Sequence, residues 1–136
     1  MPNQMIFLHG LEGTSQGVKA TLLREIFPHI LTPDFRGSLD ERMEILERIL
    51  KEGTGWQIIG SSFGGLMAAL YASHHPEKVE KLVLLAPALV WPDFASNPPA
   101  PIDVPTVIFH GTQDQVVSLS PVMELAEKVF NKLEFN

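Results

Sequence analysis

The stretch Ile58-Ile59-Gly60-Ser61-Ser62-Phe63-Gly64-Gly65 joins an apolar run to helix-forming residues through a Gly-x-Ser-x-Gly pattern. This pattern is typical of a sharp strand-to-helix turn that exposes its central serine, the nucleophile elbow. Glycine is expected on both sides of Ser62, because a β-carbon at Gly60 or Gly64 would collide with neighbouring chain. The following helix would also offer free amides to a negative charge. The pattern therefore favours a nucleophilic Ser62 over a plain glycine-rich turn.

Apolar runs and helical patterns alternate along the rest of the chain. Strands are predicted at residues 5–8, 30–34, 56–59, 81–85, 106–109 and 133–136. Helices are predicted at 18–27 after a Ser15 cap, at 39–50 after a capping box at 38–41, at 63–74, and from Pro121 after Ser120. The third helix is apolar nearly all round and should be buried. This alternation predicts an α/β fold, a mostly parallel sheet flanked by helices with ligands at the carboxyl ends of its strands.

The composition fits a single domain over residues 1–136, with 45% hydrophobic residues to form a core. A formal net charge of -6 without a basic stripe argues against nucleic acid or an anionic membrane as partner. The chain has no cysteine, which excludes disulfides and a thiol nucleophile. No apolar run has signal-peptide character or the roughly 20 residues that span a bilayer. We therefore expect a soluble cytoplasmic protein, and no histidine–acid spacing predicts a metal site.

A serine nucleophile requires a histidine base and an acid that orients it, in the order serine, acid, histidine for this architecture. Asp114 follows the predicted strand at 106–109 in the turn His110-Gly111-Thr112-Gln113-Asp114 and is the favoured acid. Asp93, in the proline-rich loop after the preceding strand, is the alternative acid. Either aspartate could instead be an ordinary turn or solvated residue.

Acyl transfer also needs donors for the oxyanion. The expected donors are the Phe63 amide after the nucleophile and the Leu11 amide in the loop after the first strand. His9 and Gly10 would let that loop approach the pocket, although they could form a simple turn. Trp91 and Phe94 in the loop at 86–103 could wall the site. A phosphate-binding loop at 10–15 is disfavoured because it lacks the P-loop lysine and the spacing of a dinucleotide motif.

The chain resembles the α/β-hydrolase superfamily and, within it, the small bacterial YqiA-like esterases. The resemblance runs nearly end to end. It rests on His9-Gly10, Thr14-Ser15, Lys19-Ala20 with Leu22-Leu23, Asp34-Phe35-Arg36-Gly37, residues 60–65, Pro87, and His110-Gly111 before Asp114. It implies an α/β-hydrolase core that is short at its C-terminus. It also implies hydrolysis of a small-molecule carboxylic ester through an acyl-enzyme at Ser62, without a cofactor.

One part of the family pattern is not matched. The family's catalytic histidine follows a further strand beyond the acid, and none of the five histidines of this chain has that position. We therefore expect either a truncated chain or a degenerate relative that binds a ligand without turnover, and an inactive 136-residue chain in both cases. Thioester hydrolysis or acyl transfer by the same serine stays open. The last strand would leave a sheet edge through which copies could associate.

Overall fold

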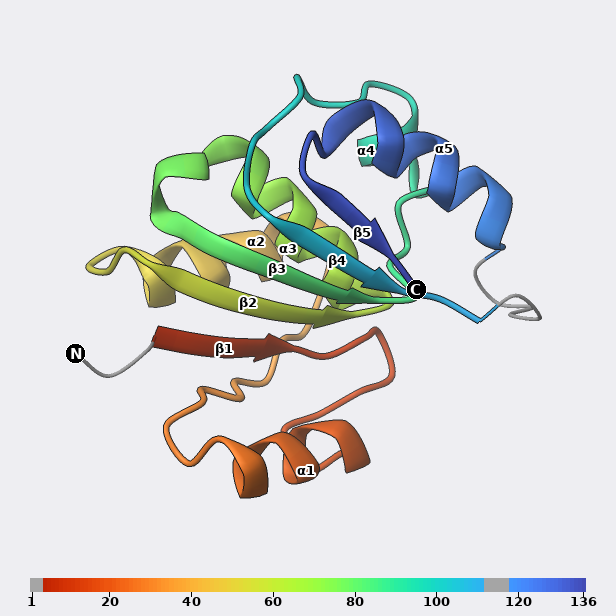
Figure 1. Cartoon of the computed structure of the whole chain (residues 1–136). Coiled ribbons are helices and arrows are strands. Elements are labelled where there is room, and N and C mark those ends of the chain that lie inside the picture. The colour runs from red at the N-terminus through yellow and green to blue at the C-terminus, as the bar shows by residue number, and fades with distance from the viewer. Residues whose placement is uncertain (1–3, 112–117) are drawn as a thin grey trace.

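The computed structural model of the chain describes residues 4–111 and 118–136. In these residues one five-stranded sheet has the order β1-β2-β3-β4-β5, and each neighbouring pair is parallel (Figure 1). The parallel α/β architecture is thereby confirmed. The strands are β1 (Gln4–Leu8), β2 (Trp56–Ser61), β3 (Val79–Leu85), β4 (Thr106–Phe109) and β5 (Leu133–Phe135).

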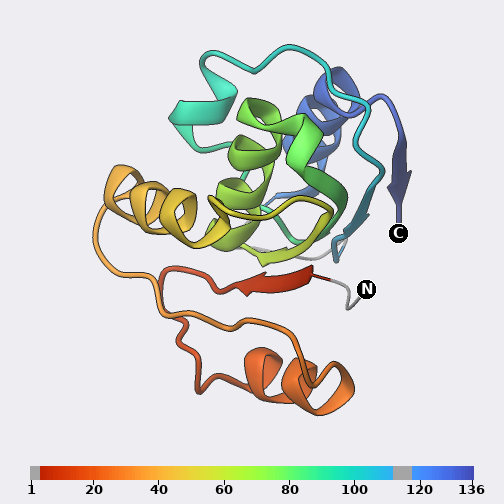
Figure 2. The ribbon, with the colours of Figure 1, turned by 90° about the vertical axis from the view of Figure 1, so that its left-hand side faces the viewer.

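Helices cover the two faces of the sheet unequally. One face carries α1 alone, and the other carries α2, α3, α4 and α5 (Figure 2). The helices are α1 (Val18–Ile26), α2 (Leu39–Leu50), α3 (Phe63–His74), α4 (Pro92–Ala95) and α5 (Leu119–Val129), with a 3₁₀ turn η1 (Pro76–Lys78) before β3. None of the helices in the described ranges is long and apolar enough to cross a membrane.

The connections on either side of β1 run in opposite directions. After α1 the chain returns beside β1, where Leu31 forms a parallel bridge with Ile6. After α2 it lies on the other side of β1, where Ile58 of β2 pairs with the same Ile6. Right-handed crossovers in opposite directions place α1 and α2 on opposite faces. The carboxyl ends of β1 and β2 therefore border the crevice in which open α/β sheets bind ligands.

The main core lies between the sheet and the helices α2, α3 and α5. Helix α3 is its centre, because nine of its twelve residues are buried. This confirms the prediction of a helix that is apolar on all sides. A smaller cluster of Phe7, Ala20, Ile30 and Ile59 lies on the α1 side of the sheet. The α2 cap is also confirmed, since the Ser38 hydroxyl accepts from the Glu41 amide while the Glu41 carboxylate accepts from the Ser38 amide.

The start of α1 differs from the prediction. Its N-cap is Gly17, not Ser15. The Ser15 amide and hydroxyl donate to the two carboxylate oxygens of Asp34, at 2.6 and 2.9 Å. Ser15 is thus engaged with the segment after Leu31 and cannot cap the helix. The expected apolar face is also largely open to solvent, with Val18 85% exposed.

Two further boundaries are corrected. The strand predicted at residues 30–34 is only the single bridge at Leu31, because Pro33 has no amide hydrogen to continue a ladder. Helix α5 begins at Leu119 after the N-cap Ser118, so Ser120 is helical and Pro121 lies inside the first turn. The first turn accepts proline because its amides have no intrahelical partner. The strand predicted at the end of the chain is confirmed as β5, which pairs with Thr106–Ile108 of β4.

Candidate active site

The turn between β2 and α3 has the strained backbone that the sequence predicts. Ser62 adopts φ 54° and ψ -114° and is one of two non-glycine residues with positive φ in the described chain. A positive φ at this serine agrees with the sharp strand-to-helix turn that the sequence predicts. The backbone is held on both sides, because the Ser62 amide donates to the Leu85 carbonyl at 2.9 Å and its carbonyl accepts from Gly65 and Ala88. A rigid frame therefore maintains the strain.

Close backbone contacts explain the glycines of this turn. A β-carbon on Gly60 would lie 2.4 Å from the Gly64 carbonyl oxygen, and one on Gly64 would lie 1.9 Å from the Leu8 carbonyl oxygen. A β-carbon on Gly65 would lie 2.7 Å from Cβ of Pro87. The collisions expected at Gly60 and Gly64 are thus confirmed. They show that α3 begins in direct contact with the end of β1.

The loop after β1 lies against the serine. A β-carbon on Gly10 would be 3.5 Å from Cβ of Ser62, so the elbow lies about one side-chain atom away from the loop backbone. Neither the Leu11 amide nor the Phe63 amide has a hydrogen-bond partner among the described residues. Phe63 directly follows the nucleophile and Leu11 directly follows Gly10, so both amides remain candidates for the oxyanion donors.

His9 ties this loop to the segment after Leu31. Its Nε2 accepts from the Phe35 amide at 2.8 Å, so its proton is on Nδ1, which lies 2.6 Å from the Gly10 carbonyl oxygen. The ring is buried, and both of its nitrogens are engaged. His9 and Gly10 border a cleft of about 180 Å³ that also includes Ser61. His9 therefore links the loop to Phe35 and has no nitrogen available for a substrate.

The other expected site residues are distributed as follows. Asp114, the favoured acid, lies outside the described residues. Asp93 lies in α4 and borders a different cleft, of about 800 Å³, together with residues of α2 and α3. Trp91 is 38% exposed and its ring meets the Phe63 ring edge-on at 5.0 Å. Phe94 is fully buried in the core, so we correct its expected place in the pocket wall.

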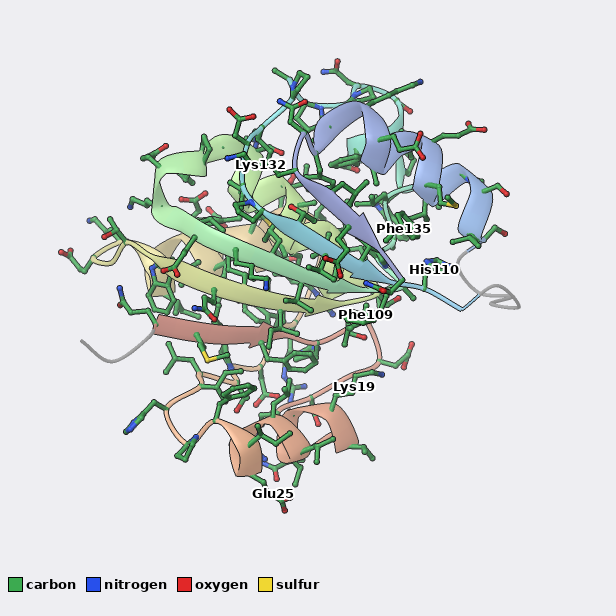
Figure 3. The ribbon with its side chains drawn as sticks, viewed as in Figure 1. Lys19, Glu25, Phe109, His110, Lys132 and Phe135 are labelled. Carbon is green, nitrogen blue, oxygen red and sulfur yellow. The ribbon has the colours of Figure 1, made fainter. Side chains whose placement is uncertain are left out.

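The other four histidines lie after α1, at the end of α3 and at the end of β4. His74 and His75 end α3, twelve residues or about 18 Å along the helix axis from the elbow. The His75 Nε2 is 2.9 Å from Glu47. His29 is exposed after α1. His110 is buried at the carboxyl end of β4, beside Phe109 (Figure 3). In the described residues, no three His, Asp or Glu side chains are grouped so that they could hold a metal ion.

Sequence reasoning missed Arg42, a buried cation in the first turn of α2. Its side chain is 5% exposed, and it contacts the loop at Leu11 and the ring of Phe63. A signal was available, because Arg42 lies three residues after Leu39 and four before Leu46, on the apolar stripe of the helix. A charge at such a position is unusual enough to indicate a specific role.

The parallel sheet and the strained serine after β2 are features of an α/β hydrolase. A sequence model of the alpha/beta hydrolase fold family matches residues 33–101, which are 69 of the 136 residues. The chain belongs to this family, as its sequence resemblance predicted. A comparison with curated protein sequences finds no match.

Solved structures with the same fold include a monoacylglycerol lipase and Est1E, which was solved with a bound acid. Alpha/beta hydrolase domain-containing protein 10 from mouse has a TM-score of 0.81 at 18% identity, over 97% of this chain and 78% of its own. A monoacylglycerol lipase from Paleococcus ferrophilus has a TM-score of 0.75 at 17% identity, over 97% and 82%. Est1E from Butyrivibrio proteoclasticus, solved with ferulic acid bound, has a TM-score of 0.75 at 18% identity, over 98% and 78%. At these identities the similarity shows the fold alone.

Proposed function

We propose that this α/β hydrolase is a serine hydrolase that cleaves small carboxylic esters through an acyl-enzyme on Ser62. The observation that carries the proposal is the strained Ser62, with φ 54°, beside the unengaged amides of Leu11 and Phe63. A strained backbone of this kind costs about 1–3 kcal/mol and is found mainly at functional sites. Its position at a topological switch point therefore supports a functional role for Ser62. Lipases and esterases among the structural neighbours make ester chemistry the natural choice.

In the proposed reaction, the Ser62 oxygen attacks the ester carbonyl and its hydroxyl proton passes to a base. The carbonyl oxygen becomes negative and accepts hydrogen bonds from the Leu11 and Phe63 amides. The carbon–oxygen bond to the alcohol then breaks, and the alcohol leaves with the proton. Water attacks the acyl-enzyme by the same route and releases the acid. We propose Asp114 as the acid that orients the histidine base.

The base itself is not assigned to a histidine of this chain. Both nitrogens of His9 are engaged beneath the loop, and His75 pairs with Glu47 at the far end of α3. Without a base, Ser62 keeps its proton and only binding and oxyanion assistance remain. These engagements favour a second candidate function, a ligand-binding domain that does not turn over its ligand. Thioester hydrolysis or acyl transfer would use the same groups with a different acyl donor or acceptor.

Chemical rescue tests the proposal. The 136-residue chain should hydrolyse p-nitrophenyl acetate very slowly, and added imidazole should raise the rate by acting as the missing base. Ser62→Ala, measured at each imidazole concentration, is the matched blank for hydrolysis by imidazole itself. With imidazole present, a fluorophosphonate should label the wild-type chain at Ser62 and leave Ser62→Ala unlabelled.

Three outcomes separate the candidates. Ser62-dependent turnover that rises with imidazole supports the hydrolase with an unassigned base. Full activity without imidazole, lost in a single histidine variant, would identify that histidine as the base and refute our assignment. Neither turnover nor labelling at any imidazole concentration would favour the ligand-binding alternative.

A further inference from the structure

Arg42 is a buried guanidinium that has no counter-ion among residues 4–111 and 118–136. Its side chain is 5% exposed, and no carboxylate in the described residues lies within ion-pair distance of it. Its Nη1 is buried and has no hydrogen-bond partner among the described residues. Burial lowers the pKa of Arg42, yet a guanidinium stays charged at neutral pH. A buried, unpaired charge is unfavourable, and a hydrophobic residue of similar size is often at least as stable in such a place.

The contacts of Arg42 join three segments around the elbow. Its Nε donates to the Gly37 carbonyl at 3.0 Å, and its Nη2 lies 3.5 Å from the Leu11 carbonyl oxygen. Its guanidinium carbon lies 5.3 Å from the centre of the Phe63 ring. One side chain therefore contacts both residues whose amides flank the crevice. Arg42 also borders a cleft of about 290 Å³ that includes Leu11 and Gly37.

The Leu11 segment has few other supports. The Leu11 side chain is 48% exposed. The loop contains two backbone hydrogen bonds, and only the one from the Gly13 amide to the Gly10 carbonyl, at 3.1 Å, spans Leu11. The rigid frame that holds Phe63, by contrast, includes the whole of α3. The distance between the two donor amides therefore depends on what holds Leu11. His9 fixes the start of the loop, and the Arg42 guanidinium donates to the Leu11 carbonyl oxygen.

We propose that Arg42 is a positioning residue that holds the Leu11 amide at the correct distance from the Phe63 amide and adds a positive charge beside the oxyanion. This inference rests on the proposed function of Ser62 and the two amides. The planar guanidinium is suited to the task because it donates in two directions and lies against an aromatic ring. A lysine could keep the charge but could not make both hydrogen bonds in the same geometry.

The competing interpretation is that Arg42 only stabilises the fold by bonding to the turn at Gly37. The two interpretations predict different effects of Arg42→Met. A purely structural residue would lower the melting temperature and leave the chemistry of the folded fraction unchanged. A positioning residue would lower kcat with little change in KM or melting temperature, because the oxyanion forms only in the transition state.

The experiment compares the full chain with Arg42→Met, Arg42→Lys and the control Arg48→Met. Arg48 is an exposed arginine on the same helix, so its replacement matches the change in charge. Ser62-dependent hydrolysis of p-nitrophenyl acetate is measured with imidazole present, and kcat and KM are determined separately. Hydrogen exchange of the Gly13 amide reports the order of the loop without requiring turnover, because this amide donates across it.

The expected result for Arg42→Met is a loss of kcat on the order of 10²-fold, because misplacing a donor by about 1 Å has this effect. The Gly13 amide should exchange about tenfold faster, because its exchange rate follows the equilibrium constant for local opening of the loop, which should rise by about the same factor. Arg42→Lys should give intermediate values, and Arg48→Met should match the wild type.

Unchanged Gly13 exchange in Arg42→Met overturns the inference whatever the activity. If the wild type shows Ser62-dependent turnover, a kcat for Arg42→Met equal to that of the wild type also overturns the inference. A wild type without any Ser62-dependent reaction refutes the proposed function instead, and the exchange of Gly13 then decides alone whether Arg42 holds the loop.

Discussion

Replacing Gly64 with alanine tests how tightly the elbow is packed. The added β-carbon would lie 1.9 Å from the Leu8 carbonyl oxygen, 2.5 Å from the Leu8 carbonyl carbon and 2.7 Å from the His9 carbonyl oxygen. All three atoms are backbone, so no side-chain rotation can relieve the contact. Reaching even a tight 3.0 Å from the Leu8 oxygen requires a relative shift of 1.1 Å, from 3.0 minus 1.9. Either β1 or the first turn of α3 must move.

The energetic effect has two opposed parts. Inserting a methyl group into a packed site usually costs about 1–3 kcal/mol, and contact with backbone belongs at the upper end of this range. Alanine is favoured over glycine inside a helix by about 1 kcal/mol. The net loss in the free energy of unfolding should therefore be about 2 kcal/mol. With a typical urea slope, this corresponds to a fall of about 1 M in the midpoint.

Urea unfolding followed by circular dichroism measures this loss. The control is Gly111→Ala, since no atom of the described residues lies within 4 Å of the β-carbon position at Gly111. This control should stay within about 0.5 kcal/mol of the wild type. If the unfolding free energy of Gly64→Ala also stays within about 0.5 kcal/mol of the wild type, the reasoning is refuted. Helix α3 and strand β1 would then be free to separate by more than 1 Å.

Further predictions concern an alkaline titration, substrate length and self-association. Tyr71 is the single tyrosine, and burial raises its pKa to about 12. Because the unfolded phenol titrates near pH 10, its contribution to stability should be complete below roughly pH 10 and fall as the pH approaches 12; phenolate absorbance near pH 10 in the folded chain would contradict this. The segment around Trp91 forms only the single turn α4, so p-nitrophenyl ester turnover should peak at short acyl chains, and a maximum at long chains would show a longer pocket. The free edge of β5 should let copies associate in sedimentation experiments, and a monomer throughout the micromolar range would argue against it.

The elbow could be predicted because its constraints are encoded locally. A strand that turns sharply into a helix needs small residues where the two elements meet, and the glycines around Ser62 record this need. The apolar composition of α3 likewise predicted its burial, because a helix without a polar face has no side to present to water. The capping box at Ser38 is a four-residue signal, and it was found for the same reason.

The contacts around the crevice could not be predicted because they join distant parts of the chain. Asp34 draws Ser15 away from the helix that it was expected to cap, across a separation of 19 residues. His9 and Phe35 are separated by 26 residues, and Arg42 and Leu11 by 31. No periodicity or turn chemistry reports such pairs. The pattern of α2 shows only that a charge interrupts an apolar stripe, and the fold is needed to show what this charge contacts.

These distant contacts have a common effect on the crevice. Ser62 and Phe63 are fixed by backbone packing that involves three glycines, whereas Leu11 is placed by side chains that bond to main-chain atoms. One half of the proposed oxyanion site thus belongs to the rigid core, and the other half depends on the hydrogen bonds of His9 and Arg42. Small losses of order in this second half would alter the distance between the amides without unfolding the chain. Substitutions beneath the loop should therefore affect reactivity more than stability, and substitutions in the elbow should affect both.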